Sequence, residues 1–330
     1  MSRRHSVFFF ALLAAPITPA AAQSVGVQGP VAGPVFISQT VRPLLGAPGA
    51  ATAGPALMTG VQWASIAPGG NWGLITQRGR SARVYTLSGA APSQVATDGL
   101  IDGIDDVVWS RDGSYALAYS SQSAQMQRLQ FSGSAASADA PLSLSSFGAV
   151  TTLAIDPSGS QMAFGASGGG LYLVQAGQSP IRLSAMAQPA AAAFDGTGAI
   201  LYAIDLATLR ILEFNSGSGP IDFASLPESG AGAEAPNPIG LAVSGDSRYL
   251  LFADAASNSI CVYDRTSQDL VNTIPLDFTP SRLEALSATP EFLLNGDRSN
   301  EWLMILDAAA SPRVYFVPAT APSRITKEAQ

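Results

Sequence analysis

One pattern recurs six times between residues 61 and 318 of this 330-residue chain. A short apolar run leads into a turn that contains Gly or Asp, and a second apolar run, a polar turn and a third apolar run follow. Clear copies begin at Trp63, Val107 and Leu153. A turn residue in the same phase recurs every 39 to 49 residues, at Gly70, Gly113, Gly159, Gly198 and Ser247. A repeat of about 40 residues built from short strands predicts an all-β fold, a β-propeller with four-stranded antiparallel blades.

The number of blades follows less directly from the repeat. Six complete copies occupy residues 61–318, and residues 23–60 contain two further strand-like runs, at 35–39 and 41–45. We expect the segment 23–60 to contribute strands to the blade that closes the ring, because a propeller must protect its free edges. Counting strands favours six blades, whereas a length of about 43 residues per blade favours seven. We predict seven blades, followed by a flexible tail over residues 319–330.

The first 22 residues have the character of a signal peptide. Arg3, Arg4 and His5 form a basic start, residues 7–15 are apolar, and small residues lead up to Ala22. The apolar core is too short to span a bilayer, and no later run reaches the roughly 18 apolar residues that a membrane helix needs. These features predict export from a bacterial cell, to the periplasm or outside it, and a mature chain without a transmembrane segment.

The charge balance limits the kinds of partner. Without residues 1–22 the chain has 15 basic and 24 acidic residues, a net charge of −9. A negative surface repels polyanions, so we expect no nucleic acid as partner. Another exported or envelope protein, or a small ligand, remains open.

Part of the repeat resembles the NHL and YVTN families of propeller repeats. Their strand–turn–strand core is matched within residues 251–264, at Ala253, Asp254, Asn258, Ile260, Val262 and Asp264. The turns at 156–159 and 195–198 are similar to those of WD40-like repeats, but the Gly-His and Trp-Asp dipeptides of that family are missing. The resemblance implies a propeller and no particular ligand, since one fold hosts many functions.

The only histidine, His5, lies in the predicted signal peptide. The mature chain therefore cannot contain a Ser-His-Asp triad, a Cys-His pair or a histidine-ligated metal site. The only cysteine, Cys261, lies in an apolar run and is predicted to be a buried, unreactive thiol. Trp63 and Trp109 occupy equivalent strand positions in adjacent copies. We expect them to pack between blades, although carbohydrate stacking is the alternative.

Carboxylates are the remaining candidates for chemistry. Asp98, Asp102, Asp105 and Asp106 lie in one loop between blades, where several acidic oxygens could hold Ca²⁺ or another divalent metal. The alternative is a solvated acidic turn, and we predict no cofactor. A second set of candidate ligand-binding residues comes from loops that we expect on the same face, at Asp205, Asp254, Asn258 and Asp297. Asp254 and Asn258 could instead satisfy the backbone amides of their own hairpin.

We therefore predict a protein- or ligand-binding scaffold and no catalytic residue. The alternative is a metal-dependent hydrolase resembling lactonase-type propellers, whose metal would be held by acidic and amide side chains. Candidate ligands for such a metal are Asp205, Glu228, Glu234, Asn237 and Asp254.

Overall fold

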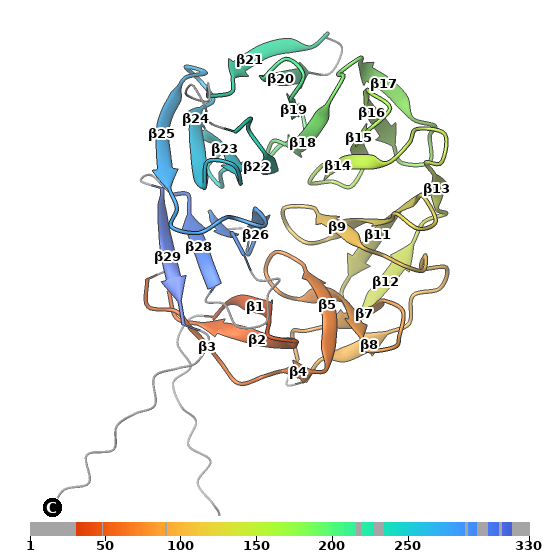
Figure 1. Cartoon of the computed structure of the whole chain (residues 1–330). Coiled ribbons are helices and arrows are strands. Elements are labelled where there is room, and N and C mark those ends of the chain that lie inside the picture. Colours follow the sequence, from red (N-terminus) through yellow and green to blue (C-terminus); the bar gives the residue numbers. More distant parts are fainter. Residues whose placement is uncertain are drawn as a thin grey trace, which may run out of the picture.

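Seven antiparallel sheets arranged in a ring form the protein, as the computed structural model shows (Figure 1). The structure describes residues 31–47, 49–89, 91–215, 219–227, 234–287, 290–295, 303–309 and 312–318. All the regular elements in these segments are strands, so the predicted all-β propeller with seven blades is confirmed. In these segments we find no helix with the length and apolar character needed to cross a membrane.

Each blade uses consecutive strands. Blade 1 contains β1 (Val31–Ile37), β2 (Thr40–Leu45), β3 (Thr52–Ala53) and β4 (Met58–Thr59). Blade 2 contains β5 (Val61–Ile66), β6 (Trp72–Gln77), β7 (Arg83–Thr86) and β8 (Ser93–Val95). Blade 3 contains β9 (Asp106–Trp109), β10 (Tyr115–Ser120), β11 (Gln125–Ser132), β12 (Ala135–Ala138) and β13 (Leu142–Ser143). Blade 4 contains β14 (Val150–Ile155), β15 (Gln161–Ala166), β16 (Leu171–Gln175) and β17 (Ile181–Ser184). Blade 5 contains β18 (Pro189–Phe194), β19 (Ile200–Asp205), β20 (Arg210–Asn215) and β21 (Ile221–Ser225). Blade 6 contains β22 (Pro238–Val243), β23 (Tyr249–Asp254), β24 (Ser259–Asp264) and β25 (Leu270–Pro275). Blade 7 contains β26 (Glu284–Ala285), β27 (Glu291–Leu293), β28 (Leu303–Asp307) and β29 (Arg313–Val317).

In blades 2 to 7 the first strand lies nearest the ring centre and later strands lie progressively further out (Figure 1). The second strand is the most deeply buried, since neighbouring blades cover both of its faces; every residue of β23 is buried. This burial explains why the second apolar run of each copy is almost free of polar residues. The outermost strands are more exposed, and Val271 of β25 keeps 52% of its surface accessible.

Blades 1 and 3 differ from the simple four-strand order. In blade 3 both β12 and β13 pair with β11, so the outer position is divided between two short strands. In blade 1 both β3 and β4 pair with β2 in the same way. The strand-like runs at 35–39 and 41–45 correspond to β1 and β2 of this sheet.

The innermost described strand of blade 1, β1, runs opposite to the inner strands of the other blades. Pro34, near the start of β1, lies beside Gly70, which follows the end of β5. At the other end, the amide of Val61, where β5 begins, donates to the carbonyl of Gln39, just after β1. The ring closes by packing: apolar residues of blade 1, such as Val35 and Leu44, share a core with blade 7.

The recurring turn residue has a conformation that explains its identity. Gly70, Gly113, Gly159 and Gly198 have φ between +66° and +77°, and Ser247 has φ of +61°. This left-handed conformation costs little for glycine and more for other residues. Each glycine also faces the preceding blade closely; a Cβ on Gly113 would lie 2.7 Å from the carbonyl oxygen of Pro68. The turns therefore set the spacing between consecutive blades.

Candidate functional site

A cavity of about 400 Å³ lies along the centre of the ring. Its walls are formed mainly by the inner strands β9, β14, β18, β22 and β26, which Figure 1 shows around the middle of the ring. Much of the wall has small side chains, including the run Ala190, Ala191, Ala192 and Ala193 of β18. Each of these inner strands pairs on one side only with another strand that the structure describes. Their other edges therefore turn backbone amide and carbonyl groups toward the cavity.

One end of the cavity, where the inner strands begin, has acidic residues at its edge. Asp106 begins β9 and Glu284 begins β26, and both line the cavity. Arg282 lies beside them, and its Nη1 is 3.0 Å from Oε2 of Glu284. Asp106 forms no ion pair with any residue in the described part of the chain. This end therefore combines one paired and one unpaired carboxylate.

The surroundings of Asp106 favour its protonated form. Its carboxyl reaches the water of the channel, but protein surrounds it on most sides. This desolvation, with smaller repulsion from Glu284 and Asp105, raises the pKa of Asp106 from 3.8 to about 6. A hydrogen bond with the backbone of Val107 opposes the shift. A cation placed close to this carboxyl would stabilise its charged form and lower its pKa.

The opposite end of the cavity contains a guanidinium group. Arg111 follows β9, lines the cavity, and donates from Nη2 to the carbonyl of Gly245, which follows β22. The Nη1 atom of Arg111 lies close to Gly196, where a Cβ would be only 2.4 Å away. The side chain thus crosses the channel from blade 3 to the turns of blades 5 and 6. No described carboxylate forms an ion pair with it.

Three of the carboxylates singled out from the sequence, Asp105, Asp205 and Asp254, hold loops together. Asp205 Oδ1 accepts from the amide of Gln188 at 2.9 Å, and Asp254 Oδ1 accepts from the amide of Asn237 at 2.7 Å. Each of these bonds joins the loop after a second strand to the loop before the inner strand of the same blade. Asp105 makes an equivalent link in blade 3, because it accepts from the amide of Ser121.

The structure brings the candidate residues to one face of the ring but does not gather them at one point. Asp98 and Asp102 are exposed on the loop before β9, and Asp205 and Asp254 are buried. Asn258 has φ of +48° in the hairpin after β23, and its Oδ1 is buried without a hydrogen-bond partner. Asp297 lies outside the described residues. Across the segments that the structure covers, no three acidic, histidine or cysteine side chains are placed to share a metal ion.

Arg111, Glu284 and Arg282 are cavity residues that the sequence reasoning missed. A signal for Arg111 exists in the aligned turns between the first and second strands. At the same turn position blades 2, 4, 5 and 6 have Pro68, Pro157, Gly196 and Gly245, so Arg111 is the one long side chain among these five turns. Its side chain therefore extends into space that the other turns leave open.

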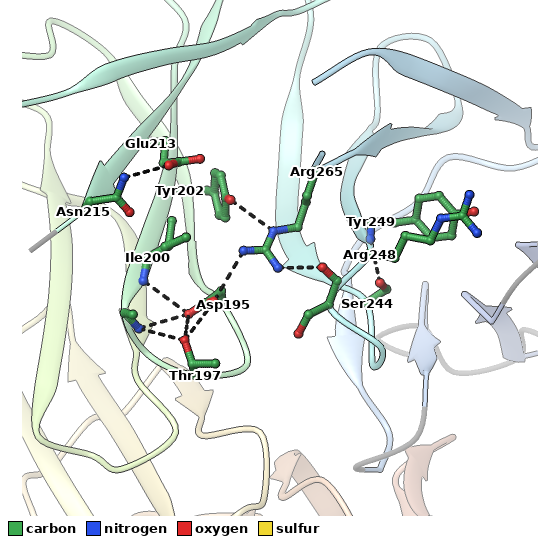
Figure 2. A network of polar contacts seen from close by, with 12 residues as sticks. Asp195, Thr197, Ile200, Tyr202, Glu213, Asn215, Ser244, Arg248, Tyr249 and Arg265 are labelled. Atoms are coloured by element: carbon green, nitrogen blue, oxygen red, sulfur yellow. Dashed lines mark hydrogen bonds and ion pairs between the residues drawn. The ribbon is translucent and has the colours of Figure 1, made fainter. Parts of the chain in front are cut away.

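A second polar network joins blades 5 and 6 (Figure 2). Arg265, after β24, donates from Nε to the hydroxyl of Tyr202 at 3.1 Å and from Nη1 to the carbonyl of Ser247 at 2.6 Å. Its Nη2 lies 3.4 Å from Oδ2 of Asp195, and both side chains are largely buried. Asp195 also accepts from Thr197 within its own turn. Desolvation raises the pKa of Tyr202 to about 12, so its hydroxyl stays protonated. These contacts connect blade 5 to blade 6.

The tryptophans and the cysteine behave as the sequence predicts. Trp109 donates from Nε1 to Ser65 Oγ of blade 2 at 2.9 Å, and its ring packs on Phe131 with centroids 5.0 Å apart. Trp63 packs against the same core. Cys261 is buried, and burial raises the pKa of its thiol. These residues therefore contribute to packing, as expected.

Comparisons with known proteins identify the fold only. No family model matches the chain, and no curated protein sequence matches it. Among solved structures, one similar protein is a catalytically inactive histidine-to-alanine variant of virginiamycin B lyase from Staphylococcus aureus with quinupristin. It has 15% identity and a TM-score of 0.55, over 80% of this chain and 86% of the lyase. A nidogen/laminin complex gives 14% identity and a TM-score of 0.48, over 73% of this chain and 92% of that chain.

Proposed function

We propose that this protein is an exported binding protein whose ligand site is the central cavity. The observation that carries the proposal is a cavity of about 400 Å³ with small apolar walls and a charged group at each end. Ligand pockets typically have volumes of about 300–1,000 Å³, with mostly apolar walls and a few placed polar groups. The residues 1–22 support export, and an exported or envelope protein could deliver or receive the ligand.

Binding is better supported than hydrolysis by the way the carboxylates are used. Asp205 and Asp254 accept backbone amides in their own blades, so their oxygens are already occupied by structural hydrogen bonds. A metal-dependent hydrolase would need several such oxygens turned toward one ion. The structurally similar lyase is inactive when a histidine is replaced by alanine. The only histidine here is His5, outside the described residues.

Filling the cavity tests the proposal. Thr151 lines the cavity with an exposed side chain, so Thr151→Trp should obstruct the channel. Thr266, in the exposed turn after β24, provides the matched control Thr266→Trp. We expect ligands from a metabolite and short-peptide collection to raise the melting temperature of the wild type and of Thr266→Trp, with the shift lost in Thr151→Trp.

Two results would contradict the proposal. One is equal ligand-induced shifts in the two tryptophan variants, which would place binding outside the channel. The other is the absence of any shift across the collection in the wild type. Native mass spectrometry of the purified wild-type protein supplies an independent readout, because a bound small molecule adds its own mass.

A further inference from the structure

The charges at the two ends of the cavity have a fixed separation and order. Asp106 is the first residue of the inner strand β9, and Arg111 lies two residues after the end of the same strand. Five residue steps of about 3.3 Å place their backbones at most about 16 Å apart along the channel. Arg111 keeps most of its donors available, since a guanidinium has five N–H groups and one donates to Gly245. The cavity therefore has an anionic and a cationic end.

The wall between these ends offers a third feature, a set of backbone hydrogen-bonding groups. Among the described strands, β14, β18 and β22 each pair only with the second strand of their own blade. Their free edges line the cavity together with small residues such as Ala192 and Gly240. An extended chain lying parallel to these strands could exchange amide hydrogen bonds with them, as in binding by strand addition. A purely apolar ligand would leave these groups unsatisfied.

Resting on the proposed function, we propose that the cavity binds a short peptide in extended conformation. Its free carboxylate pairs with the guanidinium of Arg111, and its amino terminus lies between Asp106 and Glu284. A carboxylate can accept two parallel hydrogen bonds from a guanidinium, which gives this end its selectivity. With about 3 Å taken by the contact at each end, the remaining span of roughly 10 Å fits three extended residues. Small side chains on the peptide fit the limited width of the cavity.

The first test uses the unmodified protein and three probes: trialanine, N-acetyl-trialanine and trialanine amide. Isothermal titration calorimetry should give the tightest binding for trialanine, because only it has both terminal charges. We expect blocking the carboxylate to weaken binding at least tenfold, and blocking the amine to weaken it several-fold. Equal affinity for the three peptides, or no binding of trialanine at 10 mM, would overturn the proposal.

The second test assigns the two ends. In Arg111→Gln the affinity for trialanine should fall at least tenfold, while that for trialanine amide should change less than twofold. In Asp106→Asn the preference for trialanine over N-acetyl-trialanine should disappear. Arg248→Gln is the matched control, since Arg248 is exposed and pairs with Asp264 away from the cavity. Equal losses in Arg248→Gln and Arg111→Gln would contradict the assignment.

The outcomes separate the two proposals. If trialanine does not bind but other ligands bind and Thr151→Trp abolishes their binding, the cavity is a ligand site and the peptide assignment is wrong. If Thr151→Trp reduces the binding of no ligand, the proposed function itself is wrong.

Discussion

Gly113 shows how a single position reports the architecture. Its φ of +72° explains part of the preference for glycine, and the backbone oxygen of Pro68 in the preceding blade explains the rest. Gly79 has nearly the same φ, +73°, but no atom lies within 4 Å of its missing Cβ. Comparing Gly113 with Gly79 therefore distinguishes the effect of backbone strain from the effect of close contact between blades.

Replacing Gly113 by alanine should destabilise the fold more than replacing Gly79. Both substitutions incur the left-handed strain of about 1–2 kcal/mol, while only Gly113→Ala also forces blades 2 and 3 apart. We expect the free energy of unfolding, measured by urea denaturation, to fall by about 1 kcal/mol more in Gly113→Ala than in Gly79→Ala. Equal losses would mean that the turn does not limit the approach of the blades.

Asp106 should make stability depend on pH. Folding raises its pKa from 3.8 to about 6, so the folded protein holds this proton more tightly than the unfolded chain. The stabilisation of the folded state by this raised pKa is complete below about pH 4 and is lost as the pH rises through 6. The neighbouring charges are Asp105, Glu284 and Arg282.

Because the carboxyl reaches water, we expect this loss to be on the order of 1 kcal/mol after allowance for screening. Asp106→Asn should flatten the corresponding part of the profile of unfolding free energy between pH 4 and pH 7. An unchanged profile in the variant would assign the pH dependence to other groups.

The residue scale also shows where prediction from sequence stops. The turn glycines could be identified because their phase repeats, and their conformation follows from their identity. The aligned turns distinguish Arg111 as a long side chain, but they do not predict its contact with Gly245, which lies three blades away. Asp205 and Asp254 looked like ligand residues because acidic side chains in loops serve both roles, and their amide partners depend on how two loops meet.

At the scale of elements, the contact between neighbouring blades depends on a few polar links within an apolar interface. Arg265 connects the hairpin after β24 to Asp195 and Tyr202 of blade 5 (Figure 2). Its ring contact with Tyr202, 5.3 Å from the guanidinium carbon to the ring centroid, adds a cation–π interaction. The strand periodicity of the sequence predicts the hairpin after β24 but not the residues of blade 5 that Arg265 contacts.

Removing Arg265 should destabilise this interface. Arg265→Met keeps most of the apolar stem but leaves the largely buried Asp195 without its cation, a change expected to cost about 3 kcal/mol. Arg248→Met is the control, since its pair with Asp264 is exposed and contributes about 1 kcal/mol or less. Chemical denaturation gives the free energy of unfolding of both variants. Similar losses of stability in the two would show that burial of the Arg265–Asp195 pair is unimportant.

At the scale of the whole molecule, the repeat predicted the architecture because each copy forms one sheet. The number of blades was harder to predict because the described part of blade 1 does not contain the repeated turn, and its innermost described strand runs opposite to β5. The cavity was beyond prediction for another reason: it is formed jointly by inner strands of five blades, so no single copy contains its pattern.

The junction between blades 1 and 7 is unlike the other six. Elsewhere around the ring, the polypeptide continues from one blade into the next, but none of the described sheets combines strands from both chain ends. Apolar side chains such as Leu44 and Ile305 hold this junction. Within the part of the chain that the structure describes, blades 1 and 7 can therefore separate without breaking the hydrogen bonds of any sheet. Native-state hydrogen exchange should show weaker protection in β2 and β28 than in β15 and β19, whereas uniform protection would indicate that the two blades stay together.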